Sequence, residues 1–189
     1  MKQSILSLLL FVAPLGHSFA VYIPPDFYQQ KYLPSIGFWK NYGQVIGTDG
    51  SKREDVKFHT QGSVPLAYMR SRSRVSFTLP VIDTITTTLD TVYHIEMMPF
   101  GNGALEVEPV GTILKNSHLN FQLPHCGLNG ITGVEGYSRV VYEDYFQDVD
   151  LHFYSGGFGQ KMGLVCHPGS NLAQIKLRVN GQDSLNTDL

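Results

Sequence analysis

The sequence predicts an all-β protein, an antiparallel β-sandwich of short strands joined by hairpins. Apolar residues alternate with polar ones in many short segments, as at Val149, Leu151 and Phe153. A period of two places one side of a strand in the core and the other in water. Turn pairs such as Asn180-Gly181 separate these segments. After residue 20 no segment keeps helical spacing over three turns, and only Ser170–Gln174 suggests a single capped turn.

The N-terminus predicts a secretory signal peptide over residues 1–20. Lys2 precedes an apolar run, Ile5–Leu15, and small residues at Ser18 and Ala20 fit cleavage after Ala20. The run is too short to span a bilayer, and a buried N-terminal helix is the alternative. We therefore expect a secreted or cell-surface protein without a membrane span.

The mature chain is expected to contain an extended lead-in, 21–36, followed by one β-sandwich module, 37–189. The Thr-rich segment Val81–Thr91 is predicted to be an edge strand or a long hairpin arm. Asp183–Leu189 resembles the start of a partner strand, which predicts a native protein that continues past Leu189. The clearer strands are expected at Val56–Thr60, Leu66–Met69, Val75–Leu79, Tyr93–Met97, Leu105–Val107, Leu119–Leu123 and, as four successive strands, within Tyr137–Gly181.

The composition disfavours one class of function. The chain has a formal net charge of −2 and only 16% charged residues. Proteins that bind nucleic acid neutralise phosphates with a basic surface. The sequence therefore does not predict a nucleic-acid partner.

Two cysteines, Cys126 and Cys166, are a candidate disulfide, because an exported protein matures in an oxidising compartment. The alternative is a pair of separate buried thiols that pack as small apolar residues.

Three arginines, Arg70, Arg72 and Arg74, recur at a spacing of two. A strand through them would place three guanidinium groups on one face, where they could bind an acidic glycan or another anion. The alternative is a solvated hairpin end or edge, where charges discourage aggregation.

Other polar groups do not form a recognisable catalytic, cofactor or metal motif. His125-Cys126 and Cys166-His167 are zinc-type ligands, but neighbouring residues on a strand point to opposite faces. An acidic run ending at Asp150 lacks calcium-loop spacing. The segment Gly156–Lys161 lacks the Ser or Thr and the helix of a phosphate loop. The sequence therefore predicts no catalytic residue, metal or cofactor.

Aromatic side chains are the remaining candidates for binding. An exposed row of them would form a sugar-stacking platform, whereas buried ones would belong to the edges of the core. The candidates are Trp39, Tyr42, Tyr142, Tyr145 and Tyr154.

Several motifs of the mature chain, most of them in its C-terminal half, together resemble an uncharacterised module. It occurs near the N-terminus of large secreted bacterial proteins, which often carry SBBP-type β-propeller repeats and a C-terminal secretion-sorting signal. Gln147-Asp148 replaces the module's usual Pro-Gly turn, and Leu172 stands where a proline is common. The matching residues are Phe38–Gln44, Val56–Phe58, Tyr142, Tyr145-Phe146, Val149–Leu151, Phe153-Tyr154, Val165, Pro168-Gly169, Asn171, Ile175–Gly181 and Asp183.

The resemblance implies a place in an exported protein and transfers no catalytic residues. We therefore expect a non-catalytic structural or adhesive module. Its partners would be extracellular polysaccharide or downstream domains of the same protein. The alternatives are a carbohydrate-binding module and an accessory domain of a secreted hydrolase.

Overall fold

The computed structural model describes residues 11–12, 18–19, 37–61, 63, 65–82, 89–156 and 159–181. The predicted signal peptide and lead-in lie outside the described residues, except for two short paired strands, and so does the predicted partner strand at 183–189. The elements are β1 (Phe11–Val12), β2 (Ser18–Phe19), β3 (Phe38–Lys40), β4 (Val56–Thr60), β5 (Leu66–Arg70), β6 (Arg74–Ile82), β7 (Leu89–Pro99), β8 (Val110–Phe121), the 3-10 turn η2 (Pro124–Cys126), β9 (Ile131–Phe146), β10 (Val149–Gly156), β11 (Gly159–Cys166), the 3-10 turn η3 (Leu172–Gln174) and β12 (Leu177–Asn180).

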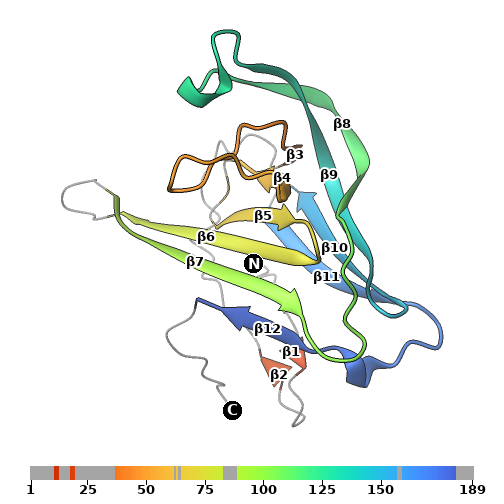
Figure 1. The fold of residues 1–189 in the computed structure, drawn as a ribbon. Helices are drawn as coiled ribbons and strands as arrows, with labels where there is room; N and C mark the ends of the chain where they lie inside the picture. Colours follow the sequence, from red (N-terminus) through yellow and green to blue (C-terminus); the bar gives the residue numbers. More distant parts are fainter. Residues whose placement is uncertain are drawn as a thin grey trace, which may run out of the picture.

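Strands β3 to β12 form one antiparallel sheet of ten strands. Its order is β11-β10-β9-β3-β4-β5-β6-β7-β12, and β8 pairs with β9 outside this path. Figure 1 shows that the sheet curls strongly. The predicted all-β, antiparallel class is confirmed. The predicted sandwich is corrected, because β3 hydrogen-bonds to both β9 and β4 and so joins the two halves of the chain in one continuous sheet.

The long strand β9 connects three other strands. β8 pairs with it from Ile131 to Val141, and β10 pairs with it from Arg139 to Phe146. β3 pairs at Gly136 and Tyr137, where β8 pairs as well. A strand has only two edges. β8 therefore lies along one edge, and β3 and β10 share the other edge end to end.

A single main core lies against the curled sheet. The alternation that predicted the strands explains it, since Val149, Leu151 and Phe153 all point inward with at most 1% exposure. Large aromatic side chains fill much of this space, with ring pairs in edge-to-face contact. The buried members are Phe38, Phe58, Ala67, Met69, Val75, Met97, Val140, Tyr142, Tyr145, Phe146, Val149, Leu151 and Phe153.

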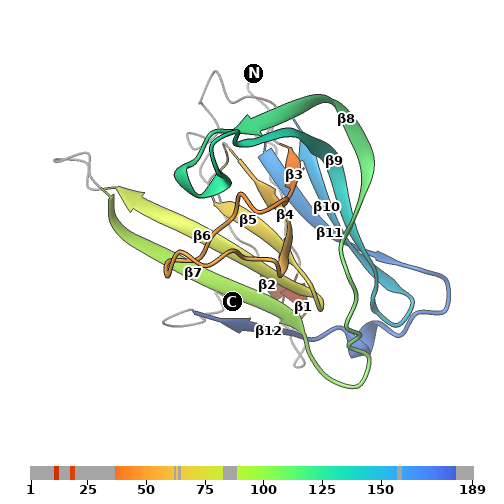
Figure 2. The same ribbon diagram turned by 45° about the horizontal axis from the view of Figure 1, so that its top comes forward.

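A second, smaller cluster lies where β8 and β9 arch over the end of β3 (Figure 2). Trp39, Phe121 and Val134 are its buried residues. Gly136 is required at this point, because a Cβ atom there would lie 2.5 Å from the Trp39 ring. The missing side chain lets the indole lie directly on the β9 backbone.

Most predicted strands are present, and three details differ. The four successive strands within Tyr137–Gly181 are confirmed as β9 to β12, and Val81–Thr91 contributes to both arms of the β6–β7 hairpin. Asn171 caps the expected 3-10 turn by accepting a hydrogen bond from the Ala173 amide. However, Leu105–Val107 forms no strand, Gly133, which the sequence suggested for a loop together with Asn129-Gly130, lies within β9, and the strand around Leu119 begins nine residues earlier, at Val110. Across the described ranges we find no helix long and apolar enough to cross a membrane.

Candidate functional site: the arginine hairpin and the lysine groove

The three candidate arginines lie on a hairpin, not along one strand face. Arg70 ends β5, Arg74 begins β6, and the two pair across the turn. Arg72 lies in the turn itself with a left-handed backbone (φ 57°). The three arginines therefore do not share one strand face, and they lie at the end of a hairpin. Spacing alone missed this because the tight turn interrupts the period of two.

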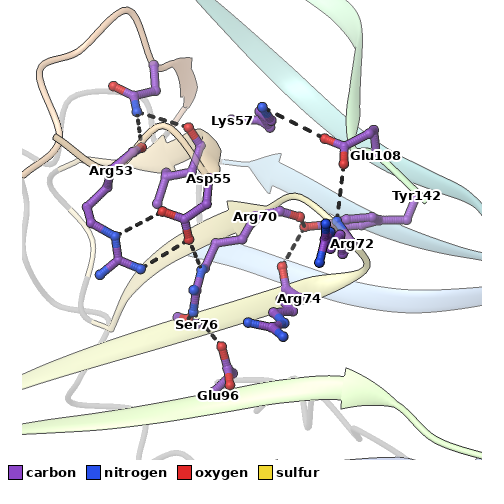
Figure 3. Close-up of polar contacts among 12 residues, drawn as sticks. Arg53, Asp55, Lys57, Arg70, Arg72, Arg74, Ser76, Glu96, Glu108 and Tyr142 are labelled. Carbon is purple, nitrogen blue, oxygen red and sulfur yellow. Dashed lines mark hydrogen bonds and ion pairs between the residues drawn. The ribbon is translucent and has the colours of Figure 1, made fainter. Parts of the chain in front are cut away.

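Arg70 is held between two carboxylates (Figure 3). Its Nε donates to Asp55 Oδ2 at 2.6 Å, and its Nη1 contacts Glu96 and donates to Ser76 Oγ at 3.1 Å. Arg53 adds a bidentate pair to Asp55, at 2.9 and 3.0 Å. The Arg70 side chain is only 13% exposed. Arg70 therefore joins the turn before β4 to β5, β6 and β7, and its charge is not available to an external anion.

Electrostatics agree with this structural role. The hydrogen bonds from Arg53 hold the pKa of the Asp55 carboxyl well below its usual range; burial opposes them, and Arg70 lowers the pKa further. The same pairing raises the pKa of Arg53. Asp55 is therefore an ionised anchor for two arginines.

A buried tyrosine and a buried serine fix the hairpin from below. The Tyr142 hydroxyl lies 2.9 Å from the Arg70 carbonyl oxygen and 2.8 Å from that of Arg74, so one hydrogen is shared between two acceptors. Burial raises the pKa of Tyr142 well above its usual value. Ser73, fully buried with φ 57°, exchanges hydrogen bonds with the segment that contains Leu105 and Val107. The hydrogen bonds of Leu105 and Val107 to Ser73 explain why the predicted strand Leu105–Val107 is an irregular segment.

Arg72 and Arg74 remain exposed beside a hollow of about 440 Å³. The walls of the hollow also include Arg53, Asp55 and Arg70. Arg72 makes only a loose contact with Glu106, at 3.9 Å, with both side chains more than two-thirds exposed. Exposed pairs of this kind contribute little stability. The two exposed arginines are the members of the predicted set that remain accessible to an anion.

A second and larger hollow, which we call the lysine groove, lies on the other side of the 52–56 segment. Its volume is about 550 Å³, in the range of ligand sites. Lys52, Glu54 and Val56 line the groove, whereas Arg53 and Asp55 line the arginine hollow, so alternate residues face alternate hollows. The remaining walls are Lys40, Asn41, Tyr42, Gly43, Lys57, Phe58, Glu108, Pro109, Val110, Gly111 and Tyr137.

One carboxylate organises the tyrosines at this groove. Glu135 Oε2 accepts hydrogen bonds from the hydroxyls of Tyr42 and Tyr137, each at 3.1 Å, and Lys40 Nζ lies 3.9 Å away. Burial, followed by Glu135, raises the pKa of Tyr137. A Cβ atom on Gly111 would lie 2.5 Å from the Tyr137 ring. The Tyr137 ring therefore contacts the β8 backbone directly at Gly111 and forms one wall of the groove.

Tyr42 is the accessible aromatic residue of the groove. It is 49% exposed, and the Lys40 ammonium lies 5.3 Å from its ring centre. The sequence singled out Tyr42 but gave no signal for Glu135 or Tyr137. Glu135 and Tyr137 come into the site on β9, and both follow Tyr42 by more than ninety positions.

The five aromatic candidates do not form a platform. Trp39, Tyr142 and Tyr145 are buried, with at most 5% exposure, and Tyr154 is half-buried under the Arg139 guanidinium at 5.0 Å. These five side chains therefore form no exposed row, and Tyr142 and Tyr145 lie within the main core rather than at its edge.

The two cysteines are free thiols. Cys126 packs near Trp39 and Val134, whereas Cys166 pairs with Val149, next to the other end of β9. A disulfide needs Cα atoms within about 7 Å. Most of a 16-residue strand separates these positions, so the candidate disulfide is not formed in this structure. The pairs His125-Cys126 and Cys166-His167 are likewise separated by most of β9.

The acidic run is tied to local structure. Asp150 accepts a hydrogen bond from the Asp144 amide at 2.9 Å and another from the His167 ring at 3.0 Å. Burial acts to raise the pKa of Asp150, but these hydrogen bonds outweigh it and lower the pKa. Among the described residues we find no group of three His, Cys, Asp or Glu side chains arranged to hold a metal ion.

A single curled antiparallel sheet, with ion pairs and tyrosine hydroxyls holding its hairpins, defines an all-β module. The family of domains of unknown function DUF7948 matches residues 38–189, and the chain belongs to this family. This match confirms the expected membership in an uncharacterised domain family. The comparisons found no matching curated protein and no matching solved structure.

Proposed function

We propose that this chain is a non-catalytic structural and adhesive module of an exported or cell-surface bacterial protein. In such proteins it would precede further domains, of which β-propeller repeats are the expected kind. The observation that supports a scaffold role most directly is the use of Arg70. The least exposed of the three candidate arginines is bound by two carboxylates and a serine, and it joins three strands, β5, β6 and β7.

Export and lack of catalysis have separate tests. The full chain expressed in a Gram-negative host should appear outside the cytoplasm with a mass that corresponds to a start at Val21. An intact Met1 on cytoplasmic protein would contradict export. Incubation with a polysaccharide panel should release no new reducing ends. A release that is lost in Asp150→Asn would contradict the non-catalytic role.

Carbohydrate binding is the second candidate function, and the lysine groove favours it. The groove combines a half-exposed ring at Tyr42 with cationic and anionic side chains. Such linings suit polyhydroxyl ligands, because sugars use both donors and acceptors and stack on aromatic faces. Retention of the full chain on immobilised polysaccharides would test this candidate.

A further inference from the structure

The lysine groove has a mixed charge pattern. Three lysines, Lys40, Lys52 and Lys57, and two glutamates, Glu54 and Glu108, line it. Glu135, which accepts the Tyr42 hydroxyl and lies 3.9 Å from Lys40, adds a third carboxylate, so cations and anions balance at the groove. A ligand in this groove would therefore meet cationic and anionic groups side by side.

The lysines are only loosely engaged by the protein. Lys57 Nζ lies 4.0 Å from Glu108, and Lys40 Nζ lies 3.9 Å from Glu135, with the side chains of both lysines more than 40% exposed. Lys52 forms no ion pair within the described part of the chain, and its aliphatic stem lies beside Gly43. Exposed pairs at such distances are weak. A ligand carboxylate can therefore bind these ammonium groups without breaking a strong internal contact.

The glutamates restrict the class of anion. A polyphosphate carries closely spaced negative charges, and Glu54 and Glu108 would repel it in the same hollow. An acidic sugar carries one carboxylate per ring, with hydroxyls between that donate to carboxylates. Tyr42 adds an aromatic face, whose negative quadrupole attracts the C–H face of a sugar ring.

We propose that the lysine groove binds a uronate-containing polysaccharide, with Lys52 and Lys57 pairing with uronate carboxylates and Tyr42 stacking on a sugar ring. This inference rests on the proposed adhesive function and its carbohydrate-binding form. It differs from the sequence-based hypothesis, which placed the acidic glycan on Arg70, Arg72 and Arg74.

The test is calorimetric titration of the full chain with oligogalacturonate, and with a neutral galactan oligomer of matched length. The variant Lys52→Gln/Lys57→Gln should weaken oligogalacturonate binding about tenfold or more. The matched control Arg72→Gln/Arg74→Gln removes two charges from the neighbouring hollow and should leave binding unchanged. Fluorescence of buried Trp39 checks that each variant is folded.

A second pair of variants separates stacking from charge. Tyr42→Ala should weaken binding about tenfold, whereas Tyr42→Phe keeps the ring and should retain most of the affinity. Equal losses in both would show that the hydroxyl contact with Glu135 matters and would overturn the stacking role.

The possible results distinguish failure of the proposed groove site from failure of the carbohydrate-binding candidate. Binding lost in the arginine variant but not in the lysine variant would overturn the groove and move the site to the arginine hollow. Equal affinity for neutral galactan would overturn the uronate class. No binding to any saccharide would overturn both this inference and the carbohydrate-binding candidate, while export of the protein would still be decided by its own test.

Discussion

Replacement of Arg70 by methionine is the most direct perturbation of the scaffold. Methionine keeps the apolar stem and removes the guanidinium, which leaves Asp55 and Glu96 without a shared counter-charge. Breaking a fully buried pair costs about 3–5 kcal/mol. Here Asp55 is 34% exposed and keeps Arg53, and Glu96 is 20% exposed, so we expect a loss of about 2–3 kcal/mol in the free energy of unfolding.

Urea denaturation followed by Trp39 fluorescence measures this loss, because the chain has one tryptophan and it is buried. For a protein of this size the melting temperature should fall by about 4–12 °C. Arg74→Met is the matched control, since Arg74 is exposed and forms no ion pair within the described ranges, and its change should stay within about 0.5 kcal/mol. Equal denaturation midpoints for the two variants would refute the assigned role of Arg70.

The pH dependence gives an independent check on the same network. The pKa of Asp55 is lowered in the folded protein, so its stabilising contribution is present above the unfolded value of about 4 and is lost as the pH falls below it. The difference in stability between wild type and Arg70→Met should therefore shrink in acid, because protonated carboxyls no longer need the guanidinium. A difference independent of pH from 7 to 3 would contradict this account.

Three further substitutions test other parts of the fold. Tyr142→Phe removes the hydroxyl that donates to the part-buried carbonyl oxygens of Arg70 and Arg74 and should cost about 1–2 kcal/mol in urea unfolding; an unchanged midpoint would show that water replaces the hydroxyl. Gly136→Ala places a methyl group against the Trp39 ring and should cost about 1–3 kcal/mol and shift the tryptophan emission, whereas Gly163→Ala, whose nearest neighbour would lie 3.8 Å away, should be tolerated. Burial lowers the pKa of His59 to about 4, so between roughly pH 6.5 and 4 only the unfolded chain binds the proton. As the pH is lowered through this window, the free energy of unfolding therefore decreases by at most about 1.4 kcal/mol per pH unit. His59→Gln should remove that slope, and a variant with the wild-type slope would assign the slope to other groups.

The sequence predicts strands well wherever one face is buried against the core. Alternation identified β10 from Val149, Leu151 and Phe153 because those side chains enter the core while their neighbours do not. The same logic missed most of β8, where eight of the twelve residues are exposed and only Phe121 is buried, so the pattern carries little burial signal. The period-two signal reports burial, not pairing.

The site was predictable in its residue types but not in its geometry. Three arginines at alternate positions indicated a charged surface, yet a tight turn at Arg72 and the distant carboxylates Asp55 and Glu96 decided which of them stays accessible. Partners so far apart in sequence leave no local pattern. The candidate disulfide has a related explanation. Cys126 and Cys166 lie near opposite ends of β9, and the sequence alone does not show how far apart the fold places them.

The pairing of β3 with the middle of β9 has a kinetic consequence. Phe38 forms its strand contacts with Tyr137, about a hundred residues further along the chain, so the loop between them must close before β3 is held on both edges. Contacts of such long range slow folding. A chain emerging from the ribosome can form the β4–β7 meander early, but it exposes one edge of β3 until β9 has been synthesised, and in that interval it has an unpaired strand edge open to misassembly.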